Sequence, residues 1–202
     1  GQETCRYLRE YDREEPFAVM VGFPGPHNPY DPAPEFARLF DPEDMPEPIP
    51  AGDDPLRLEA PGPARRRSWY AIENPEFTER HMRVMRAYYA ALVAQIDHEV
   101  GDILATLRER GMLENTVIIF STDHGDYLGD HGLTGKNSFY EPATRVPLLV
   151  RAPGGEPTRH EGLVELTDVT ATILAHAGLP VPAHMDARPL PAAGLDVQDG
   201  RE

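Results

Sequence analysis

The 202-residue sequence has a single cysteine, and it has no apolar run of the roughly 20 residues that a membrane-spanning helix requires. Because one thiol cannot form an intrachain disulfide, Cys5 excludes a disulfide framework and a cysteine-rich zinc site. Positive charge is also scarce, since 19 basic residues face 34 acidic ones and leave a formal net charge of −15. Such a surface repels phosphate backbones and anionic lipid headgroups, so we expect no nucleic-acid partner and no membrane partner.

The beginning of the chain is also unusual, because there is no initiator methionine and no apolar core of a signal peptide. A short charged segment runs directly into the apolar stretch Phe17–Phe23. We therefore expect the chain to be a piece of a longer protein. The sequence predicts no particular oligomeric state or cellular location.

Three short apolar runs bounded by turn-forming residues predict buried strands at residues 16–23, 116–122 and 146–151. The first run leads into alternating prolines at residues 24–32, which are incompatible with a helix and give a stiff loop. Residues 41–75 are rich in proline and acidic side chains and follow neither the helical nor the strand period. We expect that stretch to be a lid or a surface excursion.

A long helix is predicted from Asn74 to Arg110, with Asn74 as N-cap, a bend or break near Arg80 and Gly111 as the C-terminal stop. Apolar residues spaced by three or four positions form one stripe along it, namely Met82, Met85, Tyr89, Leu92, Ile96, Val100, Leu104 and Leu107. A second helix is predicted over residues 167–177. The order of elements predicts an α/β fold with a doubly wound, mostly parallel sheet flanked by helices.

Acidic and imidazole side chains follow the predicted strand 116–122. Asp123 and His124 come directly after it, where ligands bind in open α/β sheets. A carboxylate beside an imidazole, with further acids at Asp126 and Asp130, can form part of a divalent-metal site. The structural alternative is an Asp-His-Gly turn with a helix cap, which is common after strands.

Lys136 is the only lysine in the sequence, against 18 arginines, and it lies in a glycine-rich loop. A lysine ammonium can hold an anionic group and can also protonate a leaving oxygen, which arginine does not readily do. His27 is the other candidate, because the surrounding prolines would aim its side chain at a small entropic cost. Each alone also fits a simpler explanation, since a single lysine can survive by chance and His27 could be a solvated or packed histidine.

Several segments together resemble the sulfatases of the alkaline phosphatase superfamily. The run STDHGDYLGDHGLTGKNSFYEPATRVPLLVRAPG is similar to the second metal-binding segment of that family, and the helix and strand before it are similar as well. GFPGPHNPYDP resembles the Pro-His-x-Pro loop, and VELTDVTATILAHAGLP resembles the Asp-x-x-x-Thr helix that ends in glycine. The resemblance covers residues 16–40 and 84–182 in the order of the family.

This resemblance implies an alkaline phosphatase-like fold and a metal-dependent hydrolase that converts a small-molecule or glycan sulfate ester into an alcohol and inorganic sulfate. It implies Asp123 and His124 as metal ligands, with Ca²⁺ favoured and Mn²⁺, Mg²⁺ or Zn²⁺ as alternatives. It also implies Lys136 as a contact to the ester and His27 as a second contact, either of which could protonate the leaving group. His131 would only shape the loop or support the site residues indirectly.

The sequence also departs from the family. The sulfatase nucleophile, formylglycine, matures from a Cys/Ser-x-Pro-x-Arg motif, and neither this motif nor the family's two N-terminal aspartate ligands occurs here. Cys5 has no proline two positions later. We therefore expect one partial sulfatase catalytic domain over residues 1–202, with the lid at 41–75 and a tail at 183–202, that is inactive by itself. Two alternatives stay open: a phosphonate monoester or phosphodiester hydrolase of the same superfamily, and a non-catalytic truncated domain or pseudoenzyme.

Overall fold

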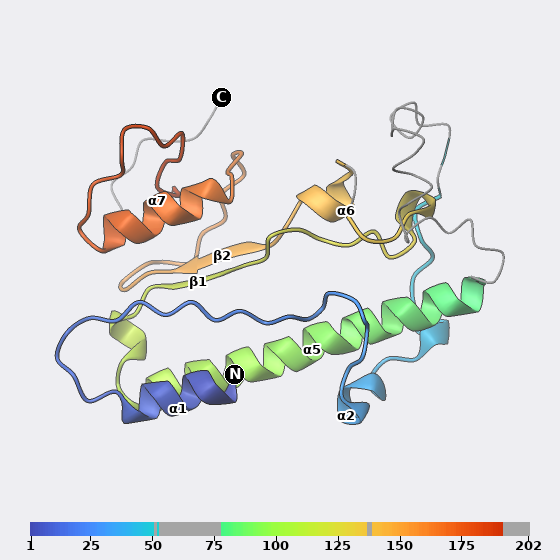
Figure 1. The fold of residues 1–202 in the computed structure, drawn as a ribbon, viewed down its shortest axis with the longest axis horizontal. Coiled ribbons are helices and arrows are strands. Elements are labelled where there is room, and N and C mark those ends of the chain that lie inside the picture. Colours follow the sequence, from blue (N-terminus) through green and yellow to red (C-terminus); the bar gives the residue numbers. More distant parts are fainter. Residues whose placement is uncertain (51, 53–77, 137–138, 192–202) are drawn as a thin grey trace. The chain divides into compact units, whose positions relative to one another are not determined.

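The computed structural model describes residues 1–50, 52, 78–136 and 139–191 (Figure 1). The chain forms two compact units: the first contains residues 1–110 and 124–145, and the second contains residues 111–123 and the chain from residue 146 onward. The chain therefore passes from the second unit back into the first between Asp123 and His124. Among the described residues, no helix combines the length and apolar character needed to cross a membrane.

The first unit is organised by the long helix α5, Glu79–Glu109. The predicted N-cap Asn74 lies outside the described residues, and the helix begins one residue before the predicted break. Thr78 caps it: its hydroxyl accepts from the amide of His81, and the His81 ring accepts from the amide of Thr78. The eight residues of the predicted apolar stripe are all buried or half-buried, which confirms the helix and the face it packs.

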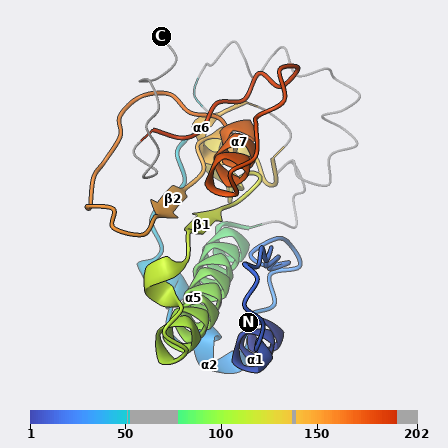
Figure 2. The ribbon, with the colours of Figure 1, turned by 90° about the vertical axis from the view of Figure 1, so that its left-hand side faces the viewer.

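Helix α1, Gln2–Glu10, was not expected from the charged N-terminal sequence. It runs beside the C-terminal half of α5 (Figures 1 and 2), and its buried residues are Cys5 and Leu8. Arg9 adds a hydrogen bond of 3.3 Å from its guanidinium to the Thr106 hydroxyl of α5. Two short helices, α2 (Pro34–Ala37) and η1 (Pro42–Asp44), also contact α5.

The predicted strand at residues 16–23 is wrong for this structure. The segment is irregular, and no ladder pairs it within the described part of the chain. Met20 is 97% exposed and Val19 is 44% exposed, so these apolar side chains are not in a core. Apolar, β-branched residues favour a strand only when a neighbouring strand satisfies the backbone, because burial and cross-strand packing supply the stability.

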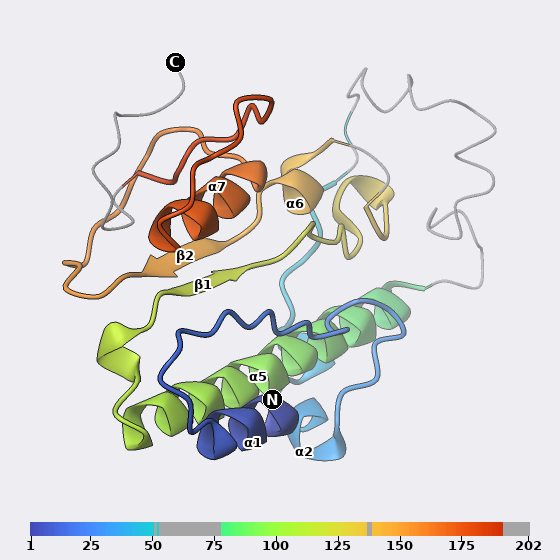
Figure 3. The same cartoon turned by 60° about the vertical axis from the view of Figure 1, so that its left-hand side comes forward.

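The second unit contains the short helix η2 (Leu113–Asn115), strand β1 (Ile118–Ser121) and strand β2 (Leu148–Arg151). Both strands lie within their predicted ranges and run side by side (Figure 3). Their pairing is antiparallel, with Ile118 opposite Arg151, so the two-stranded sheet of the described residues is not the parallel sheet that was expected. The element order predicts that two strands exist but does not determine which neighbours they pair with.

The predicted helix at 167–177 is confirmed as α7, Thr167–His176. Its Asp-x-x-x-Thr pattern has a structural explanation, because both side chains hold backbone amides. The Asp168 carboxylate accepts from the amides of Glu165 and Arg188, each at 2.9 Å. The Thr172 hydroxyl donates to the Asp168 carbonyl and accepts from the amide of Leu190, each at 2.7 Å. This helix therefore anchors the segment that follows it.

Thr172→Val is expected to destabilise the second unit by about 1–3 kcal/mol, because the isosteric change leaves the Leu190 amide without its acceptor in a buried position. Thr172 is fully buried, with 0% exposure. Urea unfolding followed by circular dichroism measures the loss. Thr170→Val is the matched control, since Thr170 is exposed on the same helix. Equal stability of the two variants would show that the amide does not depend on Thr172.

Candidate active site

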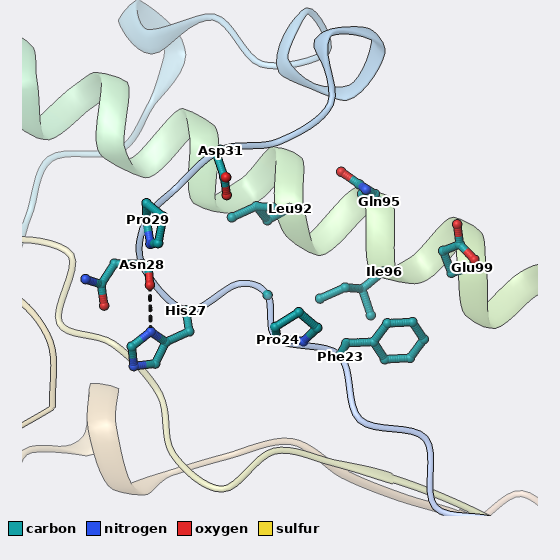
Figure 4. Close-up of a pocket in the computed structure, with 11 residues that line it drawn as sticks. Phe23, Pro24, His27, Asn28, Pro29, Asp31, Leu92, Gln95, Ile96 and Glu99 are labelled. Atoms are coloured by element: carbon teal, nitrogen blue, oxygen red, sulfur yellow. Dashed lines mark hydrogen bonds between the residues drawn. The ribbon is translucent and has the colours of Figure 1, made fainter. Parts of the chain in front are cut away.

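The proline-rich loop around residues 24–32 carries His27, whose side chain is exposed. Its ring nitrogen Nδ1 lies 2.8 Å from the carbonyl oxygen of Asn28 (Figure 4). Because a carbonyl can only accept, Nδ1 is the nitrogen that carries the proton in this hydrogen bond. The neutral ring therefore presents the lone pair of Nε2 on its other side.

Lys136 lies at that second nitrogen, with Nζ 2.5 Å from His27 Nε2. The two residues are 109 positions apart in the sequence and belong to the same unit. An ammonium group only donates, so Lys136 donates and His27 accepts in this short contact. Lys136 and His27 therefore form a donor–acceptor pair, which is an arrangement suited to proton transfer.

His124 is the third predicted site residue in the first unit. Its ring centroid lies 6.2 Å from that of His27, with an interplanar angle of 63°. Its Nδ1 lies 2.8 Å from the carbonyl oxygen of Gly125, so the proton of the neutral ring is on Nδ1 and the lone pair is on Nε2. A side chain at Gly125 would collide with the carbonyl oxygen of Pro142, so close backbone approach requires glycine here.

Asp123 follows strand β1 in the second unit, and its side chain is exposed. The Thr122 hydroxyl donates to its carboxylate at 3.4 Å. Asp123 and His124 are consecutive in the chain but belong to different units. The first unit therefore brings together His27, His124 and Lys136, and Asp123 is linked to them through the peptide bond to His124.

The two further acids are engaged in hydrogen bonds that shape the loop. Asp126 accepts from the Tyr30 hydroxyl at 2.8 Å and from two backbone amides of its own loop, those of Leu128 and Gly135. Burial raises the pKa of the nearby Tyr89 phenol, and the negative charge of Asp126 raises it further.

Within the described part of the chain, no group of three or more His, Cys, Asp or Glu side chains lies close enough together to hold a metal ion.

Asp130 pairs with Arg86 of helix α5, and the guanidinium and carboxylate are 2.6 Å apart with only 12% and 16% exposure. Arg86 also donates to the carbonyls of Leu128 and Pro46, at 2.8 and 2.7 Å. The one-turn helix η3, Asp130–Gly132, follows, and its His131 ring stacks on Tyr140 at 4.2 Å. His131 thus packs within the loop.

A pocket of about 610 Å³ lies between the proline loop and helix α5. Leu92 and Ile96 reach from α5 toward the loop, with Glu99 one turn further along, whereas the His27 imidazole extends away from the helix (Figure 4). His27 is one of the residues that line the pocket, so the pocket adjoins the candidate site.

Sequence reasoning did not single out Tyr30 or Arg86. Tyr30 is a tyrosine in a proline-rich loop, and Arg86 is one of 18 arginines, so neither residue carries a distinguishing local signal. Arg86 and Asp130 are 44 positions apart, so no local sequence pattern indicates that they form a pair.

Comparison with known proteins gives one consistent result. A sequence model of the sulfatase family matches residues 2–179. The chain is 35% identical to the choline-sulfatase of Rhizobium meliloti over 89% of its own length and 35% of the relative, and 32% identical to the arylsulfatase of Clostridium perfringens over 98% and 40%. The solved phosphonate monoester hydrolase from Silicibacter pomeroyi superposes with a TM-score of 0.75 at 32% identity, covering 87% of this chain and 37% of that one. The chain thus spans less than half the length of these proteins.

Proposed function

Because the chain belongs to the sulfatase family, we propose that it forms the part of a sulfatase active site that binds metal and protonates the leaving group. The intact protein would hydrolyse a small-molecule or glycan sulfate ester to an alcohol and inorganic sulfate. The observation that carries this proposal is the convergence of His27, Lys136 and His124 in one unit, with 2.5 Å between Lys136 Nζ and His27 Nε2.

The Lys136–His27 pair would act on the leaving group. When the bond between sulfur and the bridging oxygen breaks, negative charge develops on the departing alkoxide, and a proton delivered there lowers the barrier. Lys136 carries that proton as an ammonium and becomes a neutral amine when it gives the proton up. A proton taken from water by His27 Nε2 can then pass to the Lys136 amine and restore the ammonium. The Lys136 charge would also bind the sulfate oxygens before the bond breaks.

Asp123 and His124 would hold a divalent cation. Their donors fit: His124 has its ring proton on Nδ1, which leaves Nε2 as the nitrogen with the lone pair, and a carboxylate follows the usual preference of such ions. When bound, the ion would neutralise the ester oxygens. Oxygen ligands favour Ca²⁺, and the imidazole leaves Mn²⁺, Mg²⁺ or Zn²⁺ as alternatives.

The resemblance assigns the nucleophile to formylglycine, and the 202 residues contain no Cys/Ser-x-Pro-x-Arg motif from which it would form. The 202-residue chain would therefore bind the leaving-group side of the ester without turning it over. The same observation supports a second proposal, a non-catalytic domain that keeps the fold.

A phosphonate monoester or phosphodiester hydrolase is the alternative within the superfamily. Two observations favour it: the similarity to a solved phosphonate monoester hydrolase, and the His124 imidazole next to the proposed carboxylate ligand Asp123, because imidazole suits transition metals. Both reactions need the same proton donor and the same neutralisation of anionic oxygens, so the residue roles are shared.

Rates on matched esters separate these functions. The intact protein would be assayed with a sulfate monoester, a phosphonate monoester and a phosphodiester that all release 4-nitrophenolate. Because all three esters release the same leaving group, differences in kcat/KM depend on the group transferred. We expect the highest kcat/KM for the sulfate ester, since the chain belongs to the sulfatase family. A higher kcat/KM for the phosphonate would favour the alternative, and hydrolysis no faster than in buffer without protein would favour the non-catalytic domain.

A further inference from the structure

One carboxylate joins the two loops that carry His27 and Lys136. The Tyr30 hydroxyl, from the loop of His27, donates to Asp126 Oδ2 at 2.8 Å, and the amide of Gly135, the residue before Lys136, donates to Asp126 Oδ1 at 3.1 Å. We propose that Asp126 is a positioning residue that keeps His27 and Lys136 within proton-transfer distance. This inference rests on the proposed function of that pair.

The two side chains need such an anchor. His27 is exposed, and its other hydrogen bond is to the carbonyl of the next residue, which orients the ring but holds the loop to nothing else. Lys136 has a flexible four-carbon side chain and is only half-buried. The 2.5 Å contact between them therefore depends on where their backbones are held.

Asp126 is well suited to hold both backbones. Its carboxylate accepts three hydrogen bonds, the third from the amide of Leu128 at 3.0 Å, and bonds to an ionised acceptor are stronger than neutral ones. The Tyr30 ring also packs edge-on against Tyr89 of α5 at 6.2 Å, so the bonded hydroxyl belongs to a ring that is itself fixed. A further backbone bond, from the amide of Tyr127 to the carbonyl of Gly135 at 2.9 Å, closes the loop next to the carboxylate.

The same geometry assigns Asp126 a role different from the one expected from sequence. As one of several acids after a strand, it was a candidate to supplement the metal ligands. In the structure both of its oxygens accept hydrogen bonds from the surrounding loops. Asp126 therefore fixes the distance between the proton donor Lys136 and the proton acceptor His27.

Three variants of the intact protein test the proposal: Tyr30→Phe, Asp126→Ala and Asp126→Asn. Each would be assayed on one ester with a good leaving group, 4-nitrophenolate, and one with a poor leaving group, a simple alkoxide. Only the alkoxide needs a proton, so misplacing the donor should lower kcat selectively for the alkyl ester. We expect a loss of about 100-fold for Asp126→Ala and about tenfold for Tyr30→Phe on that substrate, with much smaller losses on the aryl ester.

Asp126→Asn is the rescue variant. Its amide oxygen can still accept from Leu128 and Gly135, and its NH₂ group can donate to the Tyr30 oxygen, so kcat on the alkyl ester should stay well above that of Asp126→Ala. Tyr88→Phe is the matched control for Tyr30→Phe, because Tyr88 is exposed on α5. Equal losses on both esters, or wild-type rates in Tyr30→Phe and Asp126→Ala, would overturn the positioning role.

A second readout does not depend on activity. The ¹⁵N resonances of the His27 ring in the 202-residue chain report whether Nε2 accepts a hydrogen bond from Lys136. Tyr30→Phe should shift Nε2 toward the value of a ring without this bond, whereas Tyr88→Phe should not. Suppose that the intact wild-type protein is inactive but the His27 resonance of the 202-residue chain responds in this way. That result would count against the proposed function and support the positioning role. An unchanged resonance in Tyr30→Phe would overturn the positioning role itself.

Discussion

Replacing Lys136 with alanine in the intact protein is expected to lower kcat by about 10²- to 10⁴-fold, the range that a positioned general acid contributes. The change removes the proton that the leaving alkoxide would receive and the positive charge that would face the sulfate oxygens. It also leaves His27 Nε2 without the group that lies 2.5 Å away. The metal content should not change, because Lys136 is not one of the proposed ligands.

Lys136→Arg separates the two roles of the ammonium. Arginine keeps the positive charge and can bind the sulfate oxygens, but it does not give up its proton near neutral pH. We therefore expect KM close to that of the wild type and kcat as low as in the alanine variant, with the deficit largest for esters of poorly acidic alcohols. Steady-state rates on aryl and alkyl sulfates give both parameters.

Arg38→Ala is the control for a general loss of positive charge, because Arg38 is exposed in the same unit and takes no part in the proposed site. Its rates should match those of the wild type. If Lys136→Ala keeps wild-type turnover on the alkyl ester, Lys136 is not part of the mechanism.

Candidate reactive groups could be named from the sequence, whereas the contacts that hold them in place could not. Asp123, His124 and Lys136 lie in one short segment, and a lone lysine among arginines is visible without a structure. The loop of His27 is marked by its prolines. Tyr30 and Asp126 are different, because a hydroxyl and a carboxylate that meet across 96 positions leave no local pattern. Local sequence thus indicates candidate reactive groups but does not indicate the long-range contacts of their loops.

The fold shows the same division between local and long-range information. Helix α5 could be predicted because its eight apolar positions repeat with the helical period, and all eight are buried or half-buried. Helix α1 was missed because its nine residues include only two that are buried, Cys5 and Leu8, within a charged segment. Strand pairing was not predictable, since the same apolar pattern fits a parallel strand, an antiparallel strand or an unpaired segment.

Helix α5 helps to hold the loop from Asp126 to Lys136, which carries one of the candidate reactive groups. Arg86 holds the Asp130 carboxylate and the carbonyl of Leu128, a residue with a left-handed backbone at φ 48°. Asp126 holds the other end of the loop through Gly135. A non-glycine residue at positive φ is unfavourable unless its surroundings hold it there, and here the largely buried Arg86 guanidinium accounts for it by binding the Leu128 carbonyl. The loop is therefore fixed at both ends.

Removing the proposed metal ligands is the second change with a large expected effect. His124→Ala and Asp123→Ala in the intact protein should each lower metal affinity by about 100-fold or more, because losing a direct ligand should cost at least as much as the 10- to 100-fold loss known for residues that only support ligands. Activity should fall in parallel and recover in part when excess Ca²⁺ is added. His98→Gln is the matched control, since His98 is exposed on α5 with 63% side-chain exposure.

The 202-residue chain itself provides the decisive comparison. A carboxylate and an imidazole satisfy only two of the six to eight positions that Ca²⁺ prefers, so isothermal calorimetry should show weak binding that disappears in the Asp123→Ala/His124→Ala double variant. The intact protein should bind the ion far more tightly, because the remaining ligands add to the same site. Tight binding to the 202-residue chain that survives both substitutions would place the metal elsewhere, and it would remove Asp123 and His124 from the proposed site while leaving the Lys136–His27 pair untouched.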